Sequence, residues 1–265
     1  MLEIFQYSFM IRALIAGLIV AAIAPLIGNF LLIRRFSMVA DTLSHIALAG
    51  VAIGLLTHTQ PILVTTILTT VIAILIEKIR SNQKIAGDTV LAMFLPGGLA
   101  VSVILISIAN GFNSNLFSYL FGSISTVTSA EIWPMLILGL VTISTVILLY
   151  KKLLFSSFDE EGARLSGINV RLISYILMTL TAITVSLAMR VVGILLIGAL
   201  MVIPSVTAMQ VAKSFRQSFF YAILFAVLAV LVGLFGAFYL DLPAGAAIVI
   251  VSLGIFGVVS VKNSV

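Results

Sequence analysis

Two ionisable side chains within a long apolar stretch are the feature of this sequence most suited to chemistry. Asp41 and His45 are four residues apart, so on a helix they lie one turn apart on the same face. Ser37 and Ser44 fall within the same arc of about 100° on that helix. An imidazole and a carboxylate in this arrangement suit a first-row divalent cation such as Zn²⁺ or Mn²⁺. Asp41 and His45 are therefore candidate metal ligands, and Ser37 and Ser44 are candidate lining residues of an ion path.

Two ligands make an incomplete metal site, and the others must come from another helix or from a second copy of the chain. Incomplete coordination suits a transporter, because an ion that is carried must also leave. The alternative is that Asp41 and His45 hydrogen-bond each other or a neighbouring helix, and their chemistry alone leaves both interpretations open. Gly50 and Gly54 form a GxxxG pattern roughly opposite the pair, where another helix can approach closely.

The composition indicates which class of protein carries this pair. Of 265 residues, 62% are hydrophobic and 9% are charged, whereas soluble domains have about 25% charged residues. The chain lacks the charge to cover a water-facing surface, so we expect an all-α polytopic membrane protein. It contains no cysteine, which excludes disulfides, thiolate metal sites and a cysteine nucleophile. The 14 basic residues are scattered between apolar runs, so no nucleic-acid partner is expected.

Nine apolar stretches have, or approach, the roughly 17–25 residues that a membrane-crossing helix needs. They are 8–33, 36–56, 61–76, 89–109, 132–150, 172–189, 191–212, 218–240 and 242–261. A β-barrel strand would alternate with period two, so these runs must be helices. Because 61–76 is short, we expect eight or nine transmembrane helices in a single transmembrane permease domain, residues 1–265. The segment 116–130 is too polar to cross and is expected to form a short re-entrant or interfacial helix.

The basic residues predict which side of the membrane each connection faces. Cytoplasmic loops are enriched in lysine and arginine, and 12 of the 14 basic residues lie in alternate connections. These are Arg34, Arg35, Lys78, Arg80, Lys84, Lys151, Lys152, Arg164, Arg171, Lys213, Arg216 and Lys262. If all nine stretches cross, the N-terminus lies outside. No GxxxxGK[ST] nucleotide-binding motif occurs, so energy must come from an ion gradient or from another polypeptide.

Three consecutive acids stand in the longest predicted cytoplasmic connection, residues 151–171. We expect a short helix that Ser157 caps, that begins near Phe158 and that carries the acids in its first turn, where the helix dipole favours them. Gly167 marks its end. Such a helix either inserts into a cytoplasmic partner or forms a solvated surface turn, and its composition leaves both interpretations open.

At the opposite side of the membrane, Arg190 and Asp241 stand in adjacent connections. We expect Arg190 either to extend its charged group to the membrane surface or to pair with Asp241. Alternatively, both residues contact an external partner. Glu131 and Asp88 are each expected in the first turn of a helix, where a negative charge is favourable.

Ordered blocks of this chain resemble the integral-membrane permeases of bacterial ABC importers for zinc and manganese, and together they cover nearly its whole length. The blocks are FLLIRRFSMVADTLSHIALAGVAIG (30–54), GDTVLAMF (87–94), NLFSYLFGSI (115–124), FDEEGARLSGINV (158–170), VVGILLIGALMVIPSVTA (191–208) and DLPAGAAIVIV (241–251).

The resemblance implies partners and roles that the residues alone do not give. It implies a homodimer in a bacterial inner or plasma membrane, with an ion path near the two-fold axis that Asp41 and His45 line. Cytoplasmic ATPase subunits would dock on a coupling helix within about 156–170, and an extracytoplasmic metal-binding protein would dock near Arg190 and Asp241. The residues expected to couple to the ATPases are Phe158, Asp159, Glu160, Glu161, Gly162 and Arg164.

We therefore expect a transporter subunit, not an enzyme, that carries Zn²⁺ or Mn²⁺ into the cytoplasm and holds no permanently bound cofactor. The alternatives are a permease for a chelated metal or cofactor, and an ion-coupled secondary carrier that uses the same pair as a proton relay. Imidazole favours Zn²⁺ and oxygen ligands favour Mn²⁺, so the sequence leaves the choice of metal, iron included, open.

Overall fold

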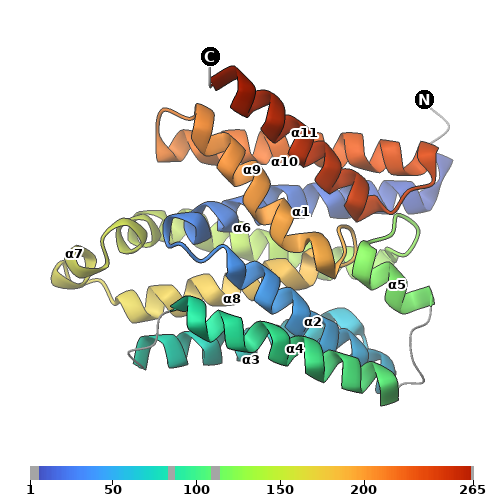
Figure 1. Cartoon of the computed structure of the whole chain (residues 1–265), viewed down its shortest axis with the longest axis horizontal. Coiled ribbons are helices and arrows are strands. Elements are labelled where there is room, and N and C mark those ends of the chain that lie inside the picture. The colour runs from blue at the N-terminus through green and yellow to red at the C-terminus, as the bar shows by residue number, and fades with distance from the viewer. Residues whose placement is uncertain (1–5, 83–86, 109–113, 264–265) are drawn as a thin grey trace.

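The computed structural model describes residues 6–82, 87–108 and 114–263. Within these ranges the secondary structure is helical and contains no strand, as Figure 1 shows. The helices are α1 (Ser8–Ile33), α2 (Met38–Leu56), α3 (Pro61–Asn82), α4 (Gly87–Ile108), α5 (Ser114–Phe121), α6 (Ser129–Phe158), α7 (Glu160–Leu165), α8 (Val170–Ala188), the 3-10 helix η2 (Ile194–Leu196), α9 (Ile197–Val211), α10 (Phe215–Leu240) and α11 (Ala244–Asn263).

Nine of the described helices are long and apolar enough to cross a membrane, which confirms the all-α polytopic fold. The third of them, α3, has 22 residues and so reaches beyond the short stretch 61–76. The eight-residue α5 is too short to cross, as expected. Lys84 and residues 109–113, which the sequence places in two connections, lie outside the described part of the chain.

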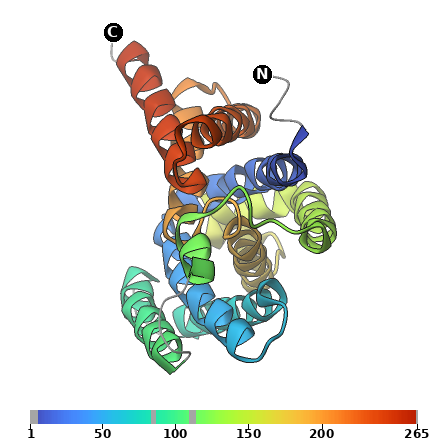
Figure 2. The ribbon, with the colours of Figure 1, turned by 90° about the vertical axis from the view of Figure 1, so that its right-hand side faces the viewer.

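The long helices form three groups, which Figures 1 and 2 show from two directions. Helices α2, α3 and α4 pack on one side of the bundle, and α9, α10 and α11 pack on the other. Between them lie α1, α6 and α8, with α1 in contact with helices of both its own group and the α9–α11 group. Helix α9 also contacts α2, so it links the two outer groups.

The connections that carry basic residues gather at one end of the bundle (left in Figure 1). The α1–α2 turn, α7 and the α9–α10 connection lie at this end, which we call the basic end. At the opposite end lie α5, the α2–α3 turn and the α10–α11 connection. The connections that carry most of the basic residues therefore lie at one end of the bundle, and the connections between them in the sequence lie at the other.

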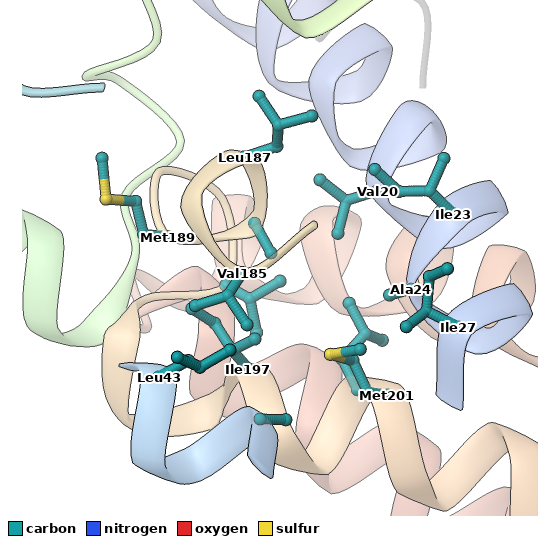
Figure 3. Close-up of a cluster of buried hydrophobic side chains, with 14 of the residues drawn as sticks. Val20, Ile23, Ala24, Ile27, Leu43, Val185, Leu187, Met189, Ile197 and Met201 are labelled. Atoms are coloured by element: carbon teal, nitrogen blue, oxygen red, sulfur yellow. The ribbon is translucent and has the colours of Figure 1, made fainter. Parts of the chain in front are cut away.

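Apolar side chains from four helices fill the centre of the bundle, as Figure 3 shows. Ala24 and Ile27 of α1 lie near Met201 of α9, while Val185 of α8 and Leu43 of α2 occupy the neighbouring part of the cluster. All five side chains are buried. Because lipid tails are as apolar as these side chains, close packing rather than the hydrophobic effect must hold the helices together.

The two glycines of the GxxxG pattern lie where α2 meets α3. A Cβ atom built on Gly50 would lie 2.6 Å from Cα of Thr65, and one on Gly54 would lie 2.7 Å from Cα of Pro61. Both neighbours are backbone atoms of α3, which cannot move aside as a flexible side chain can. This contact confirms that the GxxxG face of α2 receives another helix, and it fixes the rotation of α2 about its own axis.

We predict that Gly50→Ala destabilises the protein in detergent, because the added methyl group overlaps the backbone at Thr65. The cost should be about 1–3 kcal/mol, as for other overpacked helix contacts. Gly236→Ala in α10 is the matched control, because a Cβ there meets no atom within 4 Å. Thermal unfolding of the two variants measures the difference, and equal midpoints would contradict the assigned α2–α3 contact.

Candidate functional site

Asp41 lies in the first turn of α2 with its carboxylate against α9. A Cβ atom built on Gly198, the second residue of α9, would overlap the Asp41 carboxylate. Only glycine therefore leaves room for this carboxylate between the two helices. The sequence did not single out Gly198; its only signal is a small residue near the start of an apolar block.

His45 stands one turn further along α2, beside α4. Its carbonyl oxygen accepts a hydrogen bond of 3.0 Å from the Ser102 hydroxyl of α4, and Gly98 of the same helix packs against the His45–Ile46 backbone. The Nδ1 atom of His45 is buried and has no hydrogen-bond partner in the described part of the chain. A buried ring nitrogen without a partner remains free to bind a proton or a metal ion.

Asp41 and His45 share a face of α2 but are not bonded to each other. Among the residues that the structure describes, no hydrogen bond or ion pair joins their side chains. The alternative in which the pair serves only as its own hydrogen-bond partner is therefore not the arrangement observed. Within the same ranges no third His, Asp or Glu completes a metal-binding cluster with them.

The two serines on this face have local roles. The Ser44 hydroxyl is buried and donates a hydrogen bond of 2.7 Å to the carbonyl oxygen of Asp41. Ser37 immediately precedes α2 as its N-cap residue, without a side-chain capping bond. Their place along an ion path stays a prediction.

At the opposite end, Arg190 pairs with Glu131 and not with Asp241. An ion pair joins the Arg190 guanidinium to the Glu131 carboxylate, and both side chains are largely enclosed. The guanidinium carbon also lies 4.3 Å from the ring centroid of Tyr119 in α5. Burial raises the pKa of Tyr119 to about 12; the nearby Arg190 opposes this shift and Glu131 adds to it. The predicted Arg190–Asp241 pair is wrong, because the N-terminus of α6 brings Glu131 to the arginine.

Glu131 has a second partner, Thr128, whereas Asp241 pairs with neither Arg190 nor Thr128. The Glu131 carboxylate accepts hydrogen bonds from the backbone N–H and the hydroxyl of Thr128, each 2.9 Å long, in a capping box at the start of α6. Asp241 instead ends α10 in a left-handed conformation and is exposed. It lines a hollow of about 310 Å³ together with Ser123 and Ser125.

Two glycines hold the loops of this end close together. Gly122, with φ 73°, and Gly193, with φ 84°, adopt backbone conformations that favour glycine. A Cβ on Gly122 would overlap the carbonyl of Val191, and one on Gly193 would overlap the backbone at Phe121. A Cβ on Gly245 at the start of α11 would overlap the carbonyl of Val192. The α5–α6 connection, the connection between α8 and η2, and the first turn of α11 thus meet backbone to backbone beside α5.

At the basic end, the predicted short helix is present but begins differently. Helix α6 continues through Ser157 to Phe158, and Asp159 caps α7 by accepting a hydrogen bond of 2.8 Å from the Gly162 N–H. Ser157 cannot be the cap because its hydroxyl donates to the Leu153 carbonyl inside α6. Gly167, with φ 80°, ends the segment as predicted.

The outer surface of this segment presents apolar and charged groups together. Phe158 is 64% exposed and Leu165 is 90% exposed. Between them, Glu160 and Arg164 form an exposed ion pair of 3.3 Å. Large exposed apolar side chains on a charged helix that lies beyond the membrane-crossing helices are typical of a surface that a partner covers.

Over nearly its whole length the chain matches one protein family. Residues 6–263 match the ABC 3 transport family. The chain is 31% identical to the high-affinity zinc uptake system membrane protein ZnuB of Haemophilus influenzae, across 95% of this chain and 96% of that protein. It is 33% identical to the manganese transport system membrane protein MntC of Listeria monocytogenes, across 95% and 89%. Its fold is similar to that of a solved structure, PsaBC from Streptococcus pneumoniae in complex with Fab, with a TM-score of 0.87, 30% identity and coverage of 97% and 92%.

We predict that Glu131→Gln lowers the free energy of unfolding by about 3 kcal/mol, because it leaves an enclosed guanidinium without its counter-charge. Glu160→Gln is the matched control, since its ion pair with Arg164 is exposed and such pairs contribute about 0–1 kcal/mol. Thermal unfolding in detergent compares the two variants. If the free energy of unfolding fell by the same amount in both variants, the Glu131–Arg190 pair would not stabilise the end of the bundle opposite the basic end.

Proposed function

This chain belongs to the ABC 3 transport family, and on that premise we propose that it is the permease subunit of an ATP-binding-cassette importer that moves Zn²⁺ or Mn²⁺ into the cytoplasm. It is a multi-pass protein of a bacterial membrane, and a permease subunit is not itself an enzyme. Relatives named for zinc and for manganese transport, at 31% and 33% identity, support the substrate class. The single observation that carries the proposal is the Asp41–His45 pair on α2.

The pair has the features that a transient ion site requires. Its carboxylate and imidazole lie one turn apart on a membrane-crossing helix, and the Nδ1 atom of His45 has no other partner among the described residues. Oxygen and imidazole ligands suit both Zn²⁺ and Mn²⁺. An ionisable pair inside the membrane is costly, roughly 2.5–3.5 kcal/mol for a central Asp on insertion scales, and binding a divalent cation offsets that cost.

The missing ligands lead to the proposal that the working permease is a homodimer. No third acidic or histidine ligand stands beside Asp41 and His45 in the described ranges. A second copy, related by two-fold symmetry, would supply a second carboxylate and a second imidazole at the axis. Four such ligands complete a tetrahedral site for Zn²⁺.

Energy and ion delivery come from partners at the two ends. We propose that cytoplasmic ATPase subunits dock on α7 and its flanks, where Phe158 and Leu165 are exposed beside the acids. At the opposite end, an extracytoplasmic metal-binding protein would dock over Asp241, which lines the hollow beside α5. Because Arg190 is enclosed by Glu131 and Tyr119, it would lie beneath this docking surface and stabilise it rather than contact the metal-binding protein.

We predict that Asp41→Asn and His45→Ala each abolish metal accumulation while the complex still assembles, because each removes a metal ligand without adding bulk. Asp88→Asn is the matched control, since Asp88 is an exposed first-turn acid of α4. Uptake of Zn²⁺ and Mn²⁺ by proteoliposomes that contain the permease and its ATPase is the measurement. Normal uptake by both ligand variants would exclude the proposed site, and uptake without ATP would indicate a secondary carrier instead.

We also predict that charge reversal at Glu161, as Glu161→Lys, lowers metal transported per ATP hydrolysed, because the acid belongs to the surface that meets the ATPase. The reversed charge Lys262→Glu, in the last turn of α11 and outside the coupling segment, is the control. The measurement is uptake and ATP hydrolysis in the same vesicles. If Glu161→Lys left the ratio of metal transported to ATP hydrolysed unchanged, α7 would be a solvated turn and not the surface that meets the ATPase.

A further inference from the structure

Arg34 lies in the turn between α1 and α2 and binds two helices that are far away in the sequence. Its Nε donates to the Ser157 hydroxyl over 3.0 Å, and its Nη1 donates to the Ser174 hydroxyl over 2.7 Å. Its Nη2 donates to the Ser156 hydroxyl over 2.8 Å and, less closely, to the Ser156 carbonyl over 3.4 Å. All three nitrogens of the guanidinium are therefore engaged.

These three serines lie on either side of the short helix α7. Ser156 and Ser157 belong to the last turn of α6, and Ser174 belongs to the first turns of α8. A single guanidinium thus holds together the two helix ends from which α7 projects. The planar fork of arginine suits this geometry, because its donors point in fixed and different directions, whereas a lysine ammonium is a single point charge on a flexible stem.

The same turn is held from its other side by α3. The guanidinium carbon of Arg80 lies 4.7 Å from the ring centroid of Phe36. Two hydrogen bonds of 2.6 and 2.8 Å fix Arg80 to Glu77, whose side chain is buried. The turn that precedes α2 therefore contacts α3 on one side and the ends of α6 and α8 that flank α7 on the other.

The electrostatics of Arg34 include α7 itself. Burial lowers the pKa of Arg34, Glu77 opposes this shift, Arg80 adds to it, and Glu160 of α7 opposes it more weakly. Arginine nevertheless keeps its charge in proteins. Arg34 therefore contacts the two helix ends that flank α7 through hydrogen bonds and interacts with Glu160 of α7 through charge alone.

We propose that Arg34 is the positioning residue that passes a movement of α7 to the helix that carries Asp41 and His45. This inference rests on the proposed function, in which α7 receives the ATPase. Helix α2 begins at Met38, four residues after Arg34, and Asp41 stands in its first turn. Because α2 is a continuous helix packed closely on α3 at Gly50 and Gly54, a displacement of its first turn reaches Asp41 directly. A movement of α7 would then become a movement of the proposed metal ligands.

The test compares Arg34→Gln with Arg35→Gln in the complex of the permease with its ATPase, reconstituted in vesicles. Arg35 is the neighbouring basic residue and is exposed; its φ of 58° is as acceptable to glutamine as to arginine. For Arg34→Gln we expect the ratio of Zn²⁺ or Mn²⁺ imported to ATP hydrolysed to fall about tenfold, the size of effect that coupling residues can have. ATP hydrolysis should persist, Arg34→Lys should not restore the ratio, and Arg35→Gln should leave it unchanged.

A second readout separates transmission from simple stability. The chain has no cysteine, so Met38→Cys or Ser166→Cys each introduces a single site for a fluorescent label, at the start of α2 and just after α7. ATP should change the signal at both sites in the otherwise unaltered chain. With Arg34→Gln, the signal at residue 166 should still change and the signal at residue 38 should not.

Two results would overturn the inference. One is an unchanged transport-to-ATP ratio in an assembled Arg34→Gln complex, and the other is an ATP-dependent signal at residue 38 that is the same in Arg34→Gln as in the otherwise unaltered chain. If Arg34→Gln does not assemble, Ser174→Ala keeps the arginine and removes only its bond to α8, and an unchanged ratio there would be equally decisive against the inference. If the unaltered complex shows no ATP-dependent metal uptake, the proposed function fails first, and this outcome is distinct from the others.

Discussion

A hydrocarbon interior offers no hydrogen-bond partner to a polar group, and this constraint governs the whole molecule. Many buried hydroxyls find an acceptor within their own helix; those of Thr181 and Thr184 of α8, for example, donate to the carbonyl four residues earlier. Two of the enclosed acids near the helix ends form ion pairs, Glu77 with Arg80 and Glu131 with Arg190. The Nδ1 atom of His45 departs from this pattern, and so do five other buried atoms of the described ranges: both side-chain amide atoms of Asn29, the hydroxyls of Thr65 and Ser252, and Nε of Arg190.

Features that depend on one segment could be predicted from the sequence. The crossing helices follow from runs of apolar residues, and the face that α2 gives to α3 follows from the spacing of Gly50 and Gly54. The end of the coupling segment follows from Gly167. Each of these is a local property: length, helical period, or the backbone freedom of one residue. None of them requires knowledge of which helices become neighbours.

Features that depend on the meeting of distant segments could not be predicted. Arg190 pairs with Glu131, 59 residues earlier in the chain, because α6 begins beside the loop that follows α8. Gly198 makes room for Asp41 because α9 crosses α2 at that point, and the four hydrogen bonds of Arg34 span more than 120 residues. Even the cap of α7 depends on where α6 stops, since Ser157 stays inside the longer helix. The type and spacing of Asp41 and His45 make them candidate metal ligands in the sequence, but the groups that position them, such as Gly198, could not be predicted.

The meeting of Gly122, Gly193 and Gly245 at the opposite end has a further consequence. At each of these three positions the nearest atoms of the neighbouring segment are backbone atoms, so the close approach depends on the absence of a side chain from the glycine. None of the three glycines can be exchanged for a larger residue without moving the neighbouring segment, because the added Cβ would overlap its backbone. The distance between these segments is therefore set by three positions that accept no side chain.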